Sequence, residues 1–252
     1  MFIDINADVG ESFGQYRIGN DEALLKQITS ANIACGYHAG DHHVMHKTVQ
    51  LAVGNRVAIG AHPGLPDLMG FGRRAMAVAK EDVFNMVVYQ VGALQAFARL
   101  YGQEVAHVKP HGALYNMAAT DMVIAEAIAS AVKNIDSGLI LFGLSGSALV
   151  EAGRDAGLGV AEEVFADRTY QPDGTLTPRS RPDAVIHDIG AAVSQAVRMV
   201  KEGTVIATDG SIVPIKADTI CIHGDEPQAP AFAQQLRYQL ANHGILVRKL
   251  GG

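Results

Sequence analysis

Short apolar runs alternate with longer stretches of helical periodicity along the whole chain, and this alternation constrains the fold more than any other feature. The runs lie at residues 3–5, 31–35, 57–61, 105–108, 139–142, 160–165 and 219–222. A polar turn and a stretch with helical spacing of apolar residues follow each run. Strands that alternate with helices predict a parallel sheet covered by helices, because each parallel connection needs a long crossover.

Several helix boundaries and one hairpin can also be predicted. The clearest helix has an apolar face made of Phe84, Val87, Val88, Val91, Leu94 and Ala98. Asp41 and Thr120 are predicted to cap two other helices, and Pro230 is predicted to open the last one. Residues 204–216, with Asp209-Gly210 between two β-like stretches, predict a hairpin inserted before the last strand.

The strands are apolar and regularly spaced, which favours an α/β fold with a closed barrel over an open doubly wound sheet, the alternative. The chain has 252 residues, of which 48% are hydrophobic and 18% charged, so it is able to bury a large core. Its length alone would allow two domains, but α/β barrels of this size are common. We therefore predict a single barrel domain over residues 1–252.

Charge and cysteine content narrow the function classes. The net charge of -6 is spread without blocks, so neither nucleic acid nor an anionic membrane is expected as a partner. The N-terminus lacks the pattern of a signal peptide, and no run approaches the roughly 18 apolar residues of a membrane span. Only Cys35 and Cys221 occur, which predicts a chain without disulfides in the cytoplasm.

Polar residues follow the apolar runs, where parallel strands would end. They are Asn6, Asp8, Glu11, His38, Asp41, His62, Lys109, His111, Asp167, Arg168, His223 and Asp225. In a parallel barrel all these strand ends open on one face, and barrel enzymes keep their active sites there. We therefore expect a small polar cavity there, faced by Asp8, His38, His62, Lys109, His111 and His223.

Some of these residues also have a structural interpretation. Asp8 and Glu11 are consistent with turn or cap residues of the next helix. The exposed start of a helix accounts for His42, His43 and His46 despite their metal-like spacing. His38 differs because it lies at a strand end.

Lys109 is harder to explain as a structural residue. An ammonium at the end of a buried strand loses hydration unless an anion meets it, so a charged ligand or a pairing with Asp8 or Glu11 is implied. Two adjacent arginines in the loop at residues 70–74 suit the capture of a carboxylate or phosphate. Arg168 either pairs with Asp167 or points at a substrate.

Common catalytic motifs are absent from the sequence. It contains no G-x-x-x-x-G-K-[ST] loop, no G-x-G-x-x-G after the first strand, no G-x-S-x-G elbow and no H-E-x-x-H helix. A self-contained P-loop ATPase, a dinucleotide enzyme and a serine hydrolase are therefore disfavoured.

Longer motifs resemble those of the LamB/YcsF family, the A subunits of bacterial 5-oxoprolinase. They lie at residues 4–11, 30–41, 60–63, 70–74, 107–116, 165–168 and 221–225. The resemblance implies a distorted TIM-like (β/α)7 barrel of the glycoside hydrolase/deacetylase type. It also implies ring opening of 5-oxo-L-proline to L-glutamate, coupled to hydrolysis of ATP, with subunits B and C as partners. His42 and Tyr37 depart from residues frequent in relatives, but neither is a strand-end acid or base.

The chemistry of that reaction suggests roles for the strand-end residues. Asp8 or Glu11 is the predicted general base, with His62, His111 and His223 as proton donors or phosphate contacts. Lys109 and Arg73 would stabilise negative charge or hold the substrate carboxylate. The predicted substrate contacts are Asn6, His38, Arg73, Tyr115, Asp167, Arg168 and Asp225.

Two alternatives stay open at this point. One is a stand-alone metal-dependent amidohydrolase or deacetylase, for which Asp8, His38 and His62 are the candidate ligands. The other is a lactam-binding subunit that leaves all the chemistry to a partner. The sequence does not decide whether a metal is required.

Overall fold

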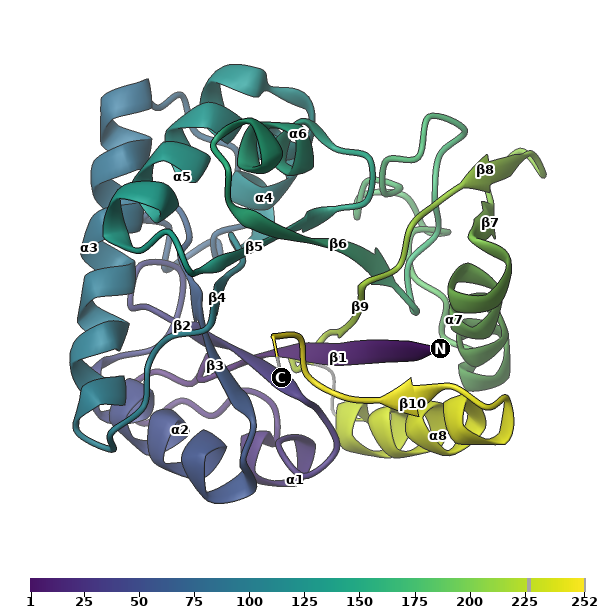
Figure 1. The fold of residues 1–252 in the computed structure, drawn as a ribbon, viewed down its shortest axis with the longest axis horizontal. Helices are drawn as coiled ribbons and strands as arrows, with labels where there is room; N and C mark the ends of the chain where they lie inside the picture. Colours follow the sequence, from purple (N-terminus) through teal and green to yellow (C-terminus); the bar gives the residue numbers. More distant parts are fainter. Residues whose placement is uncertain (226–227, 252) are drawn as a thin grey trace.

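Seven parallel strands close into a barrel in the computed structural model, which describes residues 1–225 and 228–251 (Figure 1). In barrel order they are β1 (Phe2–Val9), β2 (Ser30–Ala34), β3 (Ala58–His62), β4 (His107–Val108), β5 (Ile140–Leu144), β6 (Gly159–Phe165) and β9 (Thr219–Ile222). The seven predicted strands are confirmed. Because β9 pairs in parallel with β1 as well as with β6, the sheet has no open edge there, and the alternative of an open sheet is wrong.

Three short strands lie outside this ring. β10 (Leu246–Val247) pairs in parallel with Phe2 and Ile3, at the start of β1. β7 (Thr204–Ile206) and β8 (Ile212–Pro214) form an antiparallel hairpin, which confirms the predicted insertion before the last barrel strand.

The helices surround the strands as an outer layer (Figure 1). They are α1 (Asp21–Leu24), α2 (His42–Asn55), α3 (Lys80–Arg99), α4 (Gly112–Thr120), α5 (Met122–Ile135), α6 (Ala148–Asp155), α7 (Ile189–Glu202) and α8 (Ala229–Asn242). Among the helices within residues 1–225 and 228–251, none has the length and apolar content needed to cross a membrane.

Two of the three predicted helix starts are confirmed. Asp41 caps α2 by accepting hydrogen bonds from the backbone N–H groups of His43 and Val44, and Pro230 lies in the first turn of α8. The prediction for Thr120 is wrong because this residue ends α4, and Asp121 caps α5 instead.

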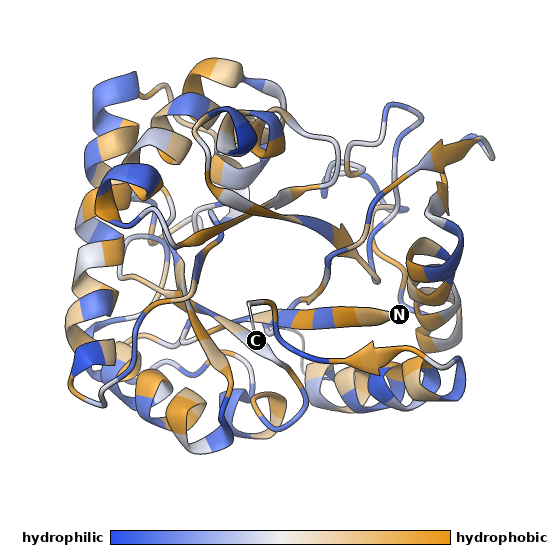
Figure 2. Ribbon diagram, viewed as in Figure 1, coloured by the Kyte–Doolittle hydropathy of each residue, from blue (hydrophilic) through white to orange (hydrophobic). Residues whose placement is uncertain are grey.

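Hydrophobic and hydrophilic residues alternate along the first strand (Figure 2), and all of them after Phe2 are buried. Ile3, Ile5, Ala7 and Val9 belong to the hydrophobic core. The side chains between them are polar and turn into the barrel, where they bond to residues of neighbouring strands. The strand is therefore longer than the predicted residues 3–5, because its polar positions are also buried.

Hydrogen bonds between strands satisfy this polar barrel interior. The Asp4 carboxylate accepts from Thr219 at 2.6 Å and from Ser30 at 2.8 Å. Asn32 donates to Asn6 at 2.7 Å, and Asn6 donates to Thr219 at 2.7 Å. Buried polar groups cost little free energy only when they are paired in this way, so the interior fixes which side chains face one another.

Gly60 in β3 provides a test of this tight interior. A Cβ at Gly60 would overlap the His107 ring, so Gly60→Ala should destabilise the fold by about 1–3 kcal/mol through overpacking. Gly54 in α2 has open space around it, so Gly54→Ala should be neutral or stabilise by up to about 1 kcal/mol. Urea unfolding midpoints compare the two variants, and equal midpoints would contradict the packing described here.

Candidate active site

The carboxyl ends of the barrel strands surround a cavity of about 560 Å³. Its lining includes eight of the predicted site residues, which are Asp8, His62, Arg73, Lys109, His111, Tyr115, Arg168 and His223. A volume of this order suits a small molecule rather than a polymer. His38 and Glu11 do not line the cavity; they lie buried next to the residues that do.

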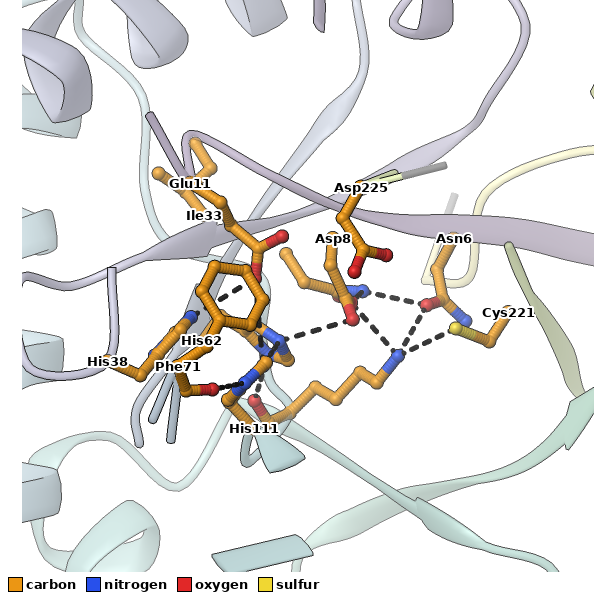
Figure 3. A network of polar contacts seen from close by, with 12 residues as sticks. Asn6, Asp8, Glu11, Ile33, His38, His62, Phe71, His111, Cys221 and Asp225 are labelled. Carbon is orange, nitrogen blue, oxygen red and sulfur yellow. Dashed lines mark hydrogen bonds and ion pairs between the residues drawn. The ribbon is translucent and has the colours of Figure 1, made fainter. Parts of the chain in front are cut away.

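Asn6, Asp8 and Cys221 lie in one polar network (Figure 3), and the Lys109 ammonium contacts all three. The ammonium nitrogen is 3.1 Å from Asp8 Oδ1, 2.8 Å from Glu163 Oε1 and 3.2 Å from Asn6 Oδ1. It also lies 3.0 Å from Cys221 Sγ. Burial alone would lower the pKa of Lys109, but the facing carboxylates outweigh burial and raise that pKa well above its usual value. The lysine is therefore a fixed positive charge at the inner end of the cavity.

Asp8 is held in its ionised form. Its Oδ1 accepts hydrogen bonds from Lys109 and, at 2.8 Å, from Asn32, and its Oδ2 lies 3.3 Å from His62 Nε2. Burial opposes ionisation, but His62 and Lys109 outweigh it and hold the pKa of Asp8 well below its usual value. An ionised carboxylate at a cavity surface suits a proton acceptor.

Glu11 has a different environment from Asp8. Burial, followed by the charges of Asp8 and Asp225, raises the pKa of Glu11 well above its usual value. Its Oε1 lies 3.1 Å from His38 Nε2. Because the two carboxyl groups have pKa values shifted in opposite directions, they are suited to different roles.

Three imidazole rings pack together beside these carboxylates. His38 stacks on His111 with ring centroids 3.6 Å apart, and His62 meets His111 edge to face at 4.8 Å. His62 Nδ1 lies 2.7 Å from the carbonyl oxygen of Lys109, and His111 Nε2 lies 2.8 Å from that of Phe71. Backbone carbonyls therefore fix the orientation of His62 and His111.

The loop at residues 70–74 supplies one of those carbonyls. Phe71 adopts a φ of 55°, which is unfavourable for a residue with a Cβ and occurs where surrounding contacts impose it. Arg73 Nη2 lies 2.7 Å from Asp225 Oδ2. Arg74 instead hydrogen bonds to Asp67 from within the same loop, so only the first arginine of the pair reaches the cavity.

Arg168 and Tyr115 line the cavity, whereas Asp167 lies next to one of its lining residues, His223. Asp167 Oδ2 lies 2.8 Å from His223 Nδ1, so Asp167 contacts the histidine rather than the adjacent arginine. Arg168 donates to the carbonyl oxygens of Ala184 at 3.0 Å and Thr177 at 2.6 Å, which ties it to the loop beside the cavity. Tyr115 is buried in the cavity lining. Substrate contact by these residues stays a prediction.

Four members of the network were not predicted from the sequence, namely Asn32, His107, Glu163 and Cys221. They lie inside apolar runs rather than after them. A charged or amide side chain within a buried strand was the available signal, since such a group needs a partner. Periodicity gave no indication of which partner each would meet.

One group within the site has the composition of a metal centre. Glu11, His38, His62 and His111 each offer a donor atom, and these atoms lie within 4.8 Å of one another. The set shares His38 and His62 with the ligands considered from sequence, but Glu11 replaces Asp8. His42 and His43 are exposed, as expected for the start of α2.

A parallel barrel with carboxylates, imidazoles and an ammonium at its carboxyl-end cavity defines the architecture of a barrel enzyme. Residues 3–252 match the LamB/YcsF family, and the chain belongs to that family. It is 58% identical to the 5-oxoprolinase A subunit of Oceanobacillus iheyensis, with 98% of this chain and 96% of the relative covered. It is 60% identical to the 5-oxoprolinase A subunit of Bacillus subtilis, with 97% and 95% covered.

Solved structures show the same fold. The lactam utilization protein from Thermus thermophilus superposes with a TM-score of 0.93 at 48% identity, covering 98% of this chain and 99% of that one. A putative cellobiose-phosphate cleavage protein from Enterococcus faecalis has a TM-score of 0.57 at 14% identity, covering 98% and 96%. The second likeness concerns the fold alone.

Replacing Lys109 tests its structural role. Lys109→Met should destabilise the protein by about 3–5 kcal/mol at neutral pH, because two buried carboxylates lose their counter-charge. Folded Asp8 has a lowered pKa, so its contribution to stability is present above the unfolded pKa and is lost on acidification. The difference between variant and wild type should therefore shrink as pH falls below about 5.

Denaturant unfolding over a pH series measures this difference. Lys80→Met is a matched control, because the exposed Lys80 forms an ion pair with Glu126 in which Nζ lies 3.5 Å from Oε2. A Lys109→Met variant as stable as this control at pH 7 would contradict the role given to the ammonium.

Proposed function

We propose that this chain is the A subunit of an ATP-dependent 5-oxoprolinase, which opens 5-oxo-L-proline to L-glutamate. The observation that carries the proposal is 58–60% identity, over nearly the full length of both chains, to relatives named as 5-oxoprolinase A subunits. The cavity supports it independently, since its size and its mixture of acids, bases and cations suit a compact carboxylated lactam.

The geometry favours Asp8 over Glu11 as general base. Asp8 lines the cavity and is ionised, whereas Glu11 lies behind it and its pKa is raised. Phosphorylation of the lactam oxygen by ATP would make the carbonyl carbon electrophilic. Water would then attack that carbon and pass a proton to Asp8, and the ring C–N bond would break as the nitrogen gains a proton. A second water molecule would hydrolyse the resulting acyl phosphate to L-glutamate and inorganic phosphate.

The cations of the cavity fit the charges of this reaction. Lys109 and Arg73 would stabilise the negative charge that develops on oxygen or hold the substrate carboxylate. His223 also lines the cavity and would deliver the proton to the leaving nitrogen, whereas the ring nitrogens of His111 already face the Phe71 carbonyl and His62.

Partner subunits complete the proposal. The sequence has no P-loop motif, yet the reaction consumes ATP, so we assign the completion of the nucleotide site to subunits B and C. The assembled enzyme would act in the cytoplasm, where the buried free thiols of Cys35 and Cys221 stay reduced.

One observation favours a second candidate, a metal-dependent amidohydrolase that acts alone. It is the convergence of Glu11, His38, His62 and His111. Such an enzyme would open the lactam without ATP or partners and would lose activity on chelation.

Reconstitution distinguishes these candidates. Release of glutamate and phosphate is measured for the chain alone and with subunits B and C, with and without ATP. We expect coupled release only in the complete mixture. ATP-independent ring opening by the chain alone would support the amidohydrolase instead.

Asp8→Asn should lower kcat of the complete mixture by about 10²–10⁴-fold, because the variant lacks the proton acceptor. Asp155→Asn is the control, since Asp155 lies on the exposed face of α6. Normal turnover in Asp8→Asn would exclude it as the base. Weakened 5-oxoproline binding with an unchanged chemical step would indicate a lactam-binding subunit without catalytic residues.

A further inference from the structure

When both rings are neutral, His62 Nε2 and His111 Nδ1 face each other without a proton to share. His62 Nδ1 and His111 Nε2 each point at a backbone carbonyl oxygen, which only accepts hydrogen bonds. Those two nitrogens therefore carry the ring protons. The other two, His62 Nε2 and His111 Nδ1, lie 2.9 Å apart with their lone pairs directed toward one another. This contact is repulsive unless a cation lies between the rings.

A proton held between the two rings would account for only part of this arrangement. It would bridge His62 Nε2 and His111 Nδ1 and would attract Asp8 Oδ2, but Glu11 Oε1 also lies 3.6 Å from His111 Nδ1. Asp8 already has the ammonium of Lys109 as its counter-charge. A metal ion accepts lone pairs from several donors at once, so it accounts for the whole convergence.

The outer contacts of both rings also match those of metal ligands. Histidines that bind metals donate their second N–H to a carbonyl or carboxylate, which fixes the ring and its tautomer. The carbonyls of Lys109 and Phe71 accept these hydrogen bonds here. The Phe71 carbonyl is delivered by a backbone with a φ of 55°, so the fold tolerates strain to place it.

We propose that Glu11, His62 and His111 bind one divalent transition-metal ion beside the cavity. Two imidazoles and a carboxylate suit Zn²⁺, Co²⁺, Ni²⁺ or Fe²⁺ better than Mg²⁺ or Ca²⁺. Tetrahedral Zn²⁺ with bonds of about 2.0–2.1 Å separates its ligand atoms by roughly 3.3 Å. The donor distances of 2.9 Å and 3.6 Å at His111 Nδ1 bracket that value.

His38 is a positioning residue in this proposal rather than a ligand. A metal lies in the plane of each imidazole that binds it, whereas His38 and His111 stack in parallel planes with centroids 3.6 Å apart. One ion therefore cannot lie in both planes. His38 Nε2 instead donates to Glu11, and His38 Nδ1, which has no partner among residues 1–225 and 228–251, is left as the unprotonated nitrogen.

The site would have an open coordination position. Three protein ligands with an open fourth position are typical of catalytic rather than structural zinc. His62 and His111 line the cavity together with Asp8, so the open position would face a water or carbonyl oxygen there. Metal binding by this chain does not depend on the proposed oxoprolinase function.

Metal titration of the purified full chain tests the proposal. After removal of metal with a chelator, Co²⁺ is added and followed by visible absorption, and Zn²⁺ is added in a calorimeter. We expect one site per chain. His62→Gln and His111→Gln should weaken binding by at least about 100-fold, and His38→Gln should weaken it by about 10–100-fold. His43→Gln, which alters an exposed histidine, should leave binding unchanged.

Circular dichroism and thermal unfolding accompany each titration. Metal that binds the folded chain should raise the Tm of the wild type, and this shift should be absent in Glu11→Gln. Failure of the wild type to bind either metal stoichiometrically would overturn the proposal, as would unchanged binding in folded His62→Gln and His111→Gln. Stoichiometric binding without 5-oxoprolinase activity would keep the metal site and reject the proposed function, and the opposite result would do the reverse.

Discussion

The ion pairs of Lys109 inside the barrel are the interaction on which the rest of the site depends. An ammonium this deeply buried is tolerable only because Asp8 and Glu163 contact it from β1 and β6. These strands lie on opposite sides of β9, and the lysine also reaches Cys221 in β9. Closure of the barrel therefore assembles the site, because it brings together the residues of β1, β6 and β9 that contact Lys109.

Fold and function share the same polar interior. Barrels of this class commonly fill the interior with layers of branched apolar side chains. Here Asp4, Asn6 and Asp8 turn inward from β1. Hydrogen bonds through Thr219 and Asn32 connect Asp4 to Asn6 and then to Asp8 at the cavity. The alternate residues of this strand, Ile3, Ile5, Ala7 and Val9, belong to the hydrophobic core instead. A network with so many fixed partners holds Asp8 in place before any substrate arrives, which is the preorganisation that catalysis requires.

The histidine cluster is positioned mainly by the backbone. Carbonyl oxygens of Lys109 and Phe71 set the tautomers of His62 and His111, while Glu11 and His38 pack behind them. Opposite pKa shifts in Asp8 and Glu11 arise from this arrangement. Asp8 faces the ammonium and His62, whereas burial and the neighbouring carboxylates dominate at Glu11. The proposed proton transfer and the proposed metal binding thus fall to different carboxylates a few residues apart in one segment.

The sequence by itself determined the strand and helix order, the strand-end placement of several charged cavity residues and the family. It could do so because hydrophobic periodicity and parallel-strand geometry are local or repetitive properties. The predicted cap at Thr120 was wrong because the adjacent Asp121, which also suits a cap position, caps α5 instead. Only the tertiary structure showed that Glu163 faces Lys109 and that Arg168 bonds to loop carbonyls. Those contacts join distant residues through barrel closure, and the charge state of a buried group depends on such neighbours rather than on its place in the sequence.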